Sequence, residues 1–341
     1  MRAITLLLAL VTLGGTACRM LPDSLAALPF VANVVSLTPW FAGSAAIALA
    51  FSFVPAWRHH HEARLFVRII AACAIALEVA WQAPFFIPSQ RVTSALAAED
   101  SQTTALRVMT CNVYKGNANA ERVVELVREN NIQVLALQET TIDFVNELKA
   151  AGIDELLPYS ERSSSDGVYG NGVWSALPLS DAASDDIGSS ASAMPAGTIE
   201  VTRPDGTTAR LRLVSVHTCS PALGYWALWE RSITEIGVVR ERLAEDDGLN
   251  YVLLGDFNAT YDHAPFREML GEGTAAGASR LHDAARECGA GITSTWPANL
   301  EIPAFCSIDH VVTSDRVIAT EVSTAEVPGS DHLALIATLE L

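Results

Sequence analysis

Eight polar residues beyond residue 104 stand where apolar, β-rich runs end. Side chains at strand ends can meet at one edge of a sheet although they are far apart in the sequence. Hard oxygen ligands of this kind suit Mg²⁺ or Mn²⁺ rather than zinc, and a histidine beside a carboxylate suits proton transfer. In chain order, the eight are Asn112, Glu139, His217, Asp256, Asn258, Asp309, Asp331 and His332.

Short motifs surround these residues, and each motif alone is typical of an ordinary turn or loop. Their order, however, resembles that of the endonuclease/exonuclease/phosphatase superfamily, which includes DNase I-like nucleases, inositol-polyphosphate phosphatases and bacterial sphingomyelinases. The resemblance covers residues 104–341. The motifs are Thr110-Cys111-Asn112-Val113, Leu137-Gln138-Glu139, Gly172-Val173-Trp174-Ser175-Ala176-Leu177-Pro178, Val216-His217, Gly255-Asp256-Phe257-Asn258, Ile308-Asp309-His310 and Ser330-Asp331-His332.

The resemblance implies a metal centre in which Glu139 binds the divalent cation, Asn112 lies beside it and Asp331 is a further ligand. The expected cofactor is Mg²⁺ or Mn²⁺, which acts as a Lewis acid on phosphate oxygens. Trp174-Ser175-Ala176 departs from the family pattern, because many members carry a Ser-Arg pair there. That departure weakens the expectation of a basic phosphate contact at this position.

The resemblance also implies the catalytic roles. Asp309 would orient His332, which would serve as general base or as a phosphate contact. Asp256 and Asn258 would position the attacking water and the phosphate. His217 would donate a hydrogen bond to a non-bridging oxygen. No serine or cysteine nucleophile is matched by the motifs, so water is expected to attack directly.

The elements that must position these residues form a mixed α/β pattern with substantial antiparallel pairing. The family fold implied is a four-layer α/β sandwich, with two central sheets covered by helices. Segments 160–172 and 179–194, rich in Ser, Gly and Asp, are expected to be loops. Strands are expected near residues 106–113, 134–138, 172–177, 197–201, 210–217, 251–255, 308–313 and 333–340, and helices near 118–130, 141–151, 222–244 and 264–270.

Charge and hydrophobicity divide the chain of 341 residues, which is 50% hydrophobic yet has a formal net charge of −17. Residues 1–90 contain five Lys/Arg and three acids, whereas residues 91–341 contain 17 basic and 36 acidic residues. This division excludes a single globular body and a transporter that fills the whole length. We expect a transmembrane region over 1–90, a linker over 91–103 and a catalytic domain over 104–341.

The apolar region predicts an N-terminal bundle of two or three transmembrane helices, with spans near residues 3–18, 33–56 and 65–87. Residues 24–57 include no charged side chain, which argues against the alternative of soluble core helices. The first run also fits the core of a cleaved signal peptide.

The segment between the second and third spans is basic and is expected to be cytoplasmic, which places the catalytic domain outside the cytoplasm. The expected localisation is therefore the cell membrane, with a multi-pass anchor. Residues 59–61 are three histidines that would bind metal or lie in a solvated loop. Glu78, inside the third run, is a functional candidate, a partner of Arg68 or an interface residue.

Four cysteines lie beyond residue 104, and none forms a CxxC pair typical of zinc sites. An oxidising exterior permits disulfides, and Cys288–Cys306 is the preferred pair, with buried thiols as the alternative. Strand alternation points Cys111 away from the side of Asn112, so Cys111 is interpreted as structural.

The sequence indicates the type of reaction more closely than it indicates the substrate. The acidic domain would repel a polyanion such as DNA, whereas a membrane tether raises the effective concentration of lipid-linked phosphates. Tyr225, Trp226 and Trp229 suit either a membrane interface or packing of a helix on the sheet.

The anchored arrangement resembles membrane-anchored teicoplanin-resistance proteins, which are similar to polyprenyl-pyrophosphate phosphatases. We expect a metal-dependent phosphoesterase that hydrolyses a phosphomonoester, pyrophosphate or phosphodiester, with lipid-linked substrates favoured. The alternatives are an extracytoplasmic nuclease acting on DNA and a non-catalytic membrane binding module. No protein partner is inferred.

Overall fold

The computed structural model describes residues 2–97, 104–246, 248–275 and 278–341. Its strands are short to medium in length and lie beyond residue 104. They are β1 (Ala105–Asn112), β2 (Val134–Gln138), β3 (Tyr159–Arg162), β4 (Asn171–Ser175), β5 (Ser180–Ala183), β6 (Ala196–Thr202), β7 (Thr208–His217), β8 (Leu249–Asp256), β9 (Leu281–Asp283), β10 (Asp309–Ser314), β11 (Ile318–Ala325) and β12 (Ala334–Glu340).

These strands form two six-stranded sheets, in the orders β11-β12-β1-β2-β4-β3 and β5-β6-β7-β8-β10-β9. In each sheet one central pair is parallel, β1 with β2 and β7 with β8. The other pairs are antiparallel. Each parallel pair brings the carboxyl ends of two strands to the same edge.

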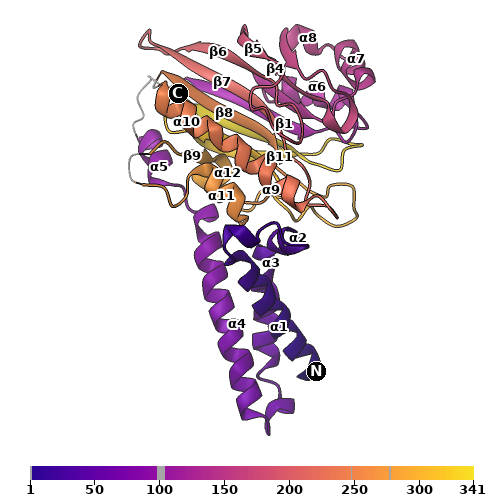
Figure 1. Ribbon diagram of the computed structural model, residues 1–341, viewed down its shortest axis with the longest axis vertical. Coiled ribbons are helices and arrows are strands. Elements are labelled where there is room, and N and C mark those ends of the chain that lie inside the picture. Colours follow the sequence, from indigo (N-terminus) through magenta and orange to yellow (C-terminus); the bar gives the residue numbers. More distant parts are fainter. Residues whose placement is uncertain (1, 98–103, 247, 276–277) are drawn as a thin grey trace.

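Helices precede the sandwich and cover its outer faces (Figure 1). The α-helices are α1 (Arg2–Arg19), α2 (Val31–Val35), α3 (Thr38–Phe51), α4 (His61–Gln82), α5 (Gln90–Ala97), α6 (Ala120–Glu129), α7 (Ile142–Ala150), α8 (Ile153–Leu156), α9 (Trp226–Thr234), α10 (Val238–Glu245), α11 (Ala264–Leu270) and α12 (Ala284–Cys288). Short 3₁₀ turns are η1 (Asp23–Leu25), η2 (Pro55–Trp57), η3 (Ala83–Phe86), η4 (Gly167–Tyr169) and η5 (Glu235–Gly237).

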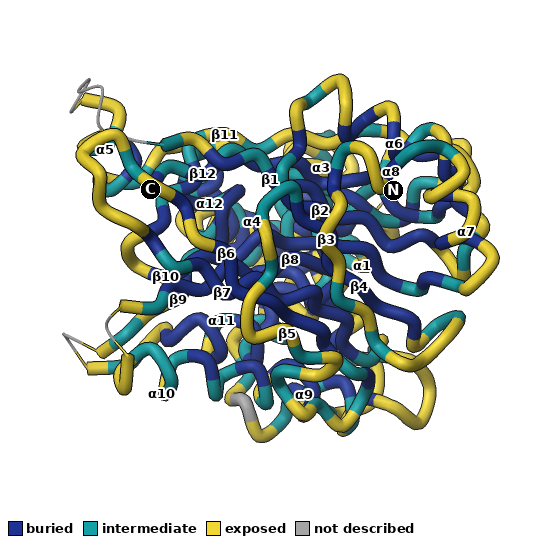
Figure 2. Tube along the Cα trace, turned by 90° about the horizontal axis from the view of Figure 1, so that it is seen from above, coloured by how far each residue is buried: buried dark blue, intermediate teal, exposed yellow. Residues whose placement is uncertain are grey.

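Both faces of the central strands are buried, because each face meets a different layer (Figure 2). In β1, Val108 packs into the core between the sheets, and the next residue, Met109, packs against the helices α6 and α7. Cys111 points to the same helical side as Met109, as strand alternation predicts. On the other sheet, Val214 of β7 packs against Trp229 of α9. The result is two mixed sheets flanked by helices, which confirms the expected sandwich.

Several elements differ from the sequence expectation. The expected loops 160–172 and 179–194 contain β3, η4 and β5, and the strands β9 and β11 were not expected. β3 and β5 are four-residue, largely exposed strands, so they lack the alternation that marks a half-buried strand. The expected helix at 222–244 is interrupted by η5.

The expected linker at residues 91–103 begins as a helix. Within α5, Arg91 forms an ion pair of 2.6 Å with Glu287 and donates a hydrogen bond of 2.6 Å to the carbonyl of Asp315. These contacts fix the start of the segment to the edge of the sandwich. The rest of the expected linker, residues 98–103, lies outside the described residues.

The N-terminal region does not have the expected helix boundaries. The run at 33–56 is not one helix, because α2 ends at Val35 and α3 starts at Thr38 with Pro39 in its first turn. Among the described residues, one helix, Arg2–Arg19, is long and apolar enough to cross a membrane by length and composition. Helices α1, α3 and α4 nevertheless pack together along their lengths, with Ala9, Ala48 and Val67 in one shared cluster (Figure 1).

Inside this bundle, Glu78 is buried and accepts a hydrogen bond of 3.4 Å from Thr16. The suggested pairing of Glu78 with Arg68 is wrong, because Arg68 donates to the Ser52 hydroxyl at 3.0 Å instead. The interpretation of Glu78 as an interface residue is the one that the packing supports.

The preferred disulfide is also wrong, because all six cysteines are free thiols. Cys288 closes α12, where its thiol reaches the carbonyl of Ala285 at 3.7 Å. Cys306 is buried, and its thiol is 3.9 Å from the carbonyl of Ser36 in the N-terminal region. The two side chains therefore lie against different elements.

Gly255 of β8 lets the backbone of this strand lie close to that of β7 in the second sheet. Its φ is 156°, and a Cβ at this position would lie 1.9 Å from the carbonyl oxygen of Val216. No real side chain tolerates that distance, so β7 and β8 could not keep this register with any other residue at position 255.

We predict that Gly255→Ala destabilises the protein by about 2–4 kcal/mol, because the strands must separate next to Asp256. Thermal unfolding of the purified protein, followed by tryptophan fluorescence, measures the effect. The control is Gly237→Ala, where an added Cβ meets nothing within 4 Å. Equal unfolding temperatures for Gly255→Ala and the wild type would contradict this account of the strand contact.

Candidate active site

Strand ends from both sheets converge at one edge of the sandwich. Asn112 ends β1, and Glu139 follows β2 directly. In the other sheet, Asp256 ends β8 and lies opposite His217 of β7 on one side and Asp309 of β10 on the other. The strand register alone therefore places three of the predicted residues side by side.

Asn112 joins the two sheets at this edge. Its Nδ2 donates to Oε1 of Glu139 at 3.2 Å and to Oδ2 of Asp256 at 3.0 Å. Its Oδ1 accepts from the backbone N–H of Tyr114 at 2.9 Å, which fixes the orientation of the amide. Glu139 has a φ of 58°, a rare conformation for a side chain of this size, and this turns it towards Asn112.

His332 is held by a carboxylate, as predicted. Its Nδ1 donates to Oδ2 of Asp309 at 2.8 Å, and its Nε2 lies 3.8 Å from Oδ2 of Asp256. Burial alone would lower the pKa of His332, but the charges of Asp309 and Asp256 and the bond to Asp309 raise it to about 10. The protonated form of the ring is therefore favoured at neutral pH.

Asp256 lies at the centre of the site and is buried. Burial raises the pKa of its carboxyl; His332 opposes this effect and Asp309 adds to it. Its Oδ1 accepts from the backbone N–H of Asn258 at 2.8 Å. His217 Nε2 lies 3.8 Å from Asp256 and 3.9 Å from Glu139, so it faces both carboxylates.

Three buried polar atoms of the site have no hydrogen-bond partner among the described residues: Oε2 of Glu139, Oδ1 of Asp309 and Nδ1 of His217. An unpartnered carboxylate oxygen is expensive to bury, and a divalent cation would compensate it. Glu139 offers such a cation a hard oxygen donor of the kind that Mg²⁺ prefers, and the Asn112 amide fixes this carboxylate from beside it. The residues present therefore fit a divalent metal.

A second acidic group, Asp256, Asp309 and His332, has its potential ligand atoms within 4.8 Å of one another. This group is less suited to a metal, because Asp309 is already bonded to His332 and the imidazolium carries its own positive charge. Asp331 lies beside His332, 3.9 Å from its Nε2, and accepts from the Trp296 indole at 3.4 Å.

An open cavity of about 910 Å³ contains the site. Seven of the eight predicted residues line it, and the eighth, Asp309, stands behind His332. The described lining includes no lysine or arginine. Outside the predicted set, the cavity lining includes Asn33, Ser36, Leu37, Tyr225, Trp296 and Phe305.

Sequence reasoning missed one residue that organises the site. Ser330 donates from its Oγ to the carbonyl of Asn112 at 2.6 Å and accepts from the backbone N–H of His332 at 2.9 Å. It therefore ties the loop of His332 to the end of β1. The signal was available, because Ser330 precedes Asp331-His332 in the matched motif.

The aromatic residues after His217 were expected either to lie at a membrane interface or to pack a helix on the sheet, and the structure differs from one residue to the next. Trp229 is fully buried and donates to the carbonyl of Asn258 at 2.8 Å, and Trp226 is buried as well. Tyr225 is 55% exposed and lines the cavity. Packing of the helix on the sheet is therefore the correct interpretation for the two tryptophans.

Comparison with known proteins assigns the fold to a family. Residues 109–332 match the model of the Endonuclease/Exonuclease/phosphatase family. The chain belongs to this family. It is accordingly an enzyme of the metal-dependent phosphoester hydrolase class, as the motifs predicted. A search of curated proteins gives no match.

Solved structures show the same fold at low identity. TDP2 of D. rerio with a single-stranded DNA product is 17% identical, with a TM-score of 0.53 over 69% of this chain and 99% of that chain. Truncated TDP2 of Caenorhabditis elegans is 18% identical, with a TM-score of 0.53 over 70% and 98%. A family protein from Bacteroides vulgatus is 20% identical, with a TM-score of 0.52 over 70% and 99%. The membrane-anchored subtype stays a prediction.

We predict that Asp309→Asn lowers the pKa of His332 far below its value of about 10, because burial remains while the negative charge that stabilises the imidazolium is lost. NMR titration of ¹³C,¹⁵N-histidine-labelled, metal-free protein measures this. His263, whose pKa is lowered by burial and which has no interaction with Asp309, is the internal reference and should titrate as before. An unchanged His332 titration would mean that Asp309 does not control this ring.

Proposed function

We propose that this chain is a membrane-anchored, divalent-metal-dependent phosphoesterase that hydrolyses a phosphomonoester, pyrophosphate or phosphodiester joined to an apolar group. The observation that carries the proposal is one cavity that contains the Asp309–His332 pair and the unpartnered carboxylate oxygen of Glu139. A proton-transfer group and a cation site on opposite sides of Asp256 are what phosphoester hydrolysis by water requires.

Glu139 would hold the cation, with Asn112 beside it, Asp331 as a further ligand and Mg²⁺ as the favoured ion. When bound, such an ion neutralises phosphate oxygens and stabilises charge on the leaving oxygen. Asn112 keeps Glu139 and Asp256 at a fixed separation, because one amide group donates to both. The two carboxylates are thus held in place for the cation and the substrate.

His332 and His217 would contact the phosphoryl group from two sides. The imidazolium of His332 presents Nε2 towards the cavity, while Asp309 fixes the ring through Nδ1. His217 presents its own Nε2 near Glu139 and Asp256 and would donate to a non-bridging oxygen. Two such donors would favour the transition state, in which negative charge on these oxygens must be stabilised.

Asp256 and Asn258 would position the attacking water. The raised pKa of Asp256 makes its carboxylate a better proton acceptor than an exposed aspartate. The Asn258 side chain donates to the carbonyl of Thr218 at 3.0 Å, which fixes the loop that presents both residues. The proton that water loses would pass to Asp256, and the His332 imidazolium, 3.8 Å away, would donate to a phosphate oxygen rather than accept this proton.

The cavity wall supports an apolar alcohol rather than DNA as the group attached to phosphate. A nucleic-acid site tracks its phosphates with lysines and arginines, and the described lining of this cavity has none. Aromatic and aliphatic side chains, among them Tyr225, Trp296 and Phe305, continue from the polar site along the wall. A lipid-linked phosphate has this same division into a charged end and an apolar end.

The side-chain pattern of the bundle supports a membrane anchor. α1 buries Thr5, Thr12 and Thr16 against its neighbours and turns Leu7 and Leu10 outward, with exposures of 60% and 55%. A helix in water shows the opposite arrangement. Helices that associate in lipid bury small and weakly polar residues and expose large apolar ones.

The positions of the basic residues support the proposed orientation of the bundle in the membrane. Arg2 hydrogen-bonds to His60, which places the start of α1 beside the turn between α3 and α4. Figure 1 shows this end of the bundle far from the sandwich. Arg58 and Arg64 belong to the same turn region. By the positive-inside rule this end is cytoplasmic, so the catalytic domain lies outside the cytoplasm.

Loss of the metal or of the proton-transfer group should abolish hydrolysis. We predict that Glu139→Gln and His332→Ala each reduce the rate on the order of 10³-fold or more while the unfolding temperature changes little. EDTA should have the same effect on the wild type. The assay offers polyprenyl pyrophosphate, sphingomyelin, phosphoinositide and plasmid DNA with Mg²⁺.

The control for this series is Glu147→Gln, an exposed carboxylate on α7 that should keep full activity. Mn²⁺ binding followed by electron paramagnetic resonance should weaken in Glu139→Gln but not in the control. Hydrolysis that survives EDTA would reject the metal assignment. Cleavage of plasmid DNA alone would replace the proposed substrate with nucleic acid, and binding without turnover would favour a non-catalytic module.

The anchor gives a separate prediction. In intact cells, externally added protease should remove the domain beyond residue 104, because the bundle would leave it outside the cytoplasm. An epitope placed before Arg2 should be protected until lysis. Protection of the catalytic domain in intact cells, with digestion only after lysis, would reverse the proposed topology.

A further inference from the structure

The cavity is not formed by the family domain alone. Besides the catalytic residues, its lining includes Asn33, Ser36 and Leu37, which belong to α2 and to the turn before α3. Figure 1 shows α2 between the bundle and the sandwich. The family match covers residues 109–332, so these three residues are an addition of this chain to the site.

Hydrogen bonds hold this segment against the catalytic domain. The Trp226 indole donates to Oδ1 of Asn33 at 3.2 Å, and Nδ2 of Asn33 donates to the carbonyl of Pro221 at 3.1 Å. Phe30 packs edge-on to the Trp226 ring, with centroids 5.3 Å apart. Trp40, at the start of α3, donates to the carbonyl of Phe305 at 2.9 Å. These contacts place the segment at a defined position rather than loosely over the opening.

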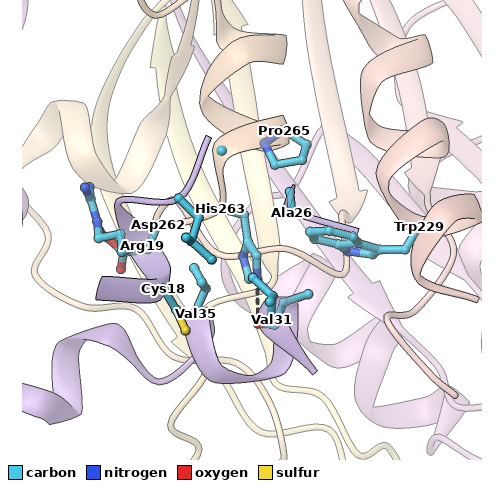
Figure 3. Close-up of a pocket in the computed structure, with 12 residues that line it drawn as sticks. Cys18, Arg19, Ala26, Val31, Val35, Trp229, Asp262, His263 and Pro265 are labelled. Atoms are coloured by element: carbon cyan, nitrogen blue, oxygen red, sulfur yellow. Dashed lines mark hydrogen bonds and ion pairs between the residues drawn. The ribbon is translucent and has the colours of Figure 1, made fainter. Parts of the chain in front are cut away.

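His263 provides the buried anchor of α2. Figure 3 shows its ring directed at α2, where Nε2 is 2.9 Å from the carbonyl of Ala32. The Thr260 N–H donates to Nδ1 at 2.8 Å, which leaves Nε2 as the donor to Ala32. Burial lowers the pKa of His263 to about 4, so the ring stays neutral at physiological pH and keeps this pattern.

The same loop carries the catalytic residues. Asn258 and His263 both lie between β8 and α11, and Trp229 of α9 contacts both residues. Its indole donates to the carbonyl of Asn258 at 2.8 Å, and its ring packs edge-on to His263, with centroids 5.1 Å apart. Asp262 of this loop forms an ion pair of 2.5 Å with Arg19 at the end of α1. The N-terminal wall is therefore fixed relative to the reacting atoms.

Leu37 is the apolar residue among the three that this segment contributes to the cavity lining. It is 37% exposed and lines the cavity together with Tyr225, Trp296 and Phe305. Glu139 and His332 line the polar part of the same cavity. An apolar side chain left open beside a phosphoryl site has room for an apolar part of the substrate.

We propose that residues 33–37 form a specificity subsite for the apolar group esterified to the phosphoryl group, with Leu37 as its specificity-determining residue. The inference rests on the proposed function for the position of the phosphoryl group. The N-terminal region would then be a part of the substrate site as well as an anchor. Each methylene that moves from water to this wall should strengthen binding about two- to fourfold.

The test measures binding of n-alkyl phosphonates, from methyl to octyl, to the full chain in nanodiscs with Mg²⁺. Isothermal titration calorimetry gives each Kd, with empty nanodiscs as the blank. In the wild type, Kd should fall about two- to fourfold per methylene until the subsite is filled. Leu37→Glu should remove this dependence, and repulsion between its carboxylate and the phosphonate should weaken binding by the same factor at every chain length.

Leu37→Met should restore the chain-length dependence, because the apolar volume is kept. The matched control is Leu96→Glu, since Leu96 is 56% exposed on α5 and does not line the cavity. It should bind every phosphonate as the wild type does. Should Leu37→Glu unfold, Leu37→Ala is measured, and its dependence on chain length should be about half that of the wild type.

Equal Kd values for methyl and octyl phosphonate in the wild type, or an unchanged dependence in Leu37→Glu and Leu37→Ala, would overturn the subsite. Hydrolysis of the substrate panel by the same preparation tests the proposed function separately. Chain-length-dependent binding without hydrolysis would keep the subsite and reject the phosphoesterase. Hydrolysis without chain-length dependence would keep the phosphoesterase and reject the subsite.

Discussion

The gathering of three carboxylates at one edge of the sandwich is the constraint on which the rest of the structure depends. Glu139, Asp256 and Asp309 repel one another, and burial raises the pKa of Asp256. Asn112 relieves part of this by donating to Glu139 in one sheet and Asp256 in the other. His332 relieves another part through Asp309. What remains uncompensated is the charge that a divalent cation would neutralise.

Such a cluster can exist only where two sheets hold their strand ends together. Val108 and Leu254 belong to the apolar core between the sheets, and that core sets the distance over which Asn112 can reach Asp256. Close contact of β7 and β8 at Gly255 keeps His217 and Asp256 in register. The polar site is thus positioned by apolar packing a few residues away, which is why changes in the core near Gly255 should affect the site.

The N-terminal region meets the catalytic domain through polar contacts at defined points. Asp262 and His263 follow the catalytic loop and bind Arg19 and Ala32, respectively. An anchor that served only to tether the domain would need no such contacts, because a flexible linker is sufficient for tethering. Direct hydrogen bonds to the loop of Asn258 instead make α2 a fixed wall of the cavity. Anchoring and substrate selection would then be properties of the same segment.

The sequence by itself determined the family and predicted eight site residues and a two-part organisation, because ordered motifs and charge distribution are local properties of the chain. It did not determine the partners of Ser330, Cys306 or Leu37, since these depend on segments hundreds of residues away. The break between α2 and α3 was also hidden within a continuous apolar run. Hydrophobicity indicates the length of such a run but not where the chain turns within it. Tertiary structure alone decided that Asn112 bridges the sheets and that the N-terminal region completes the cavity, because only packing brings these distant segments within hydrogen-bond distance.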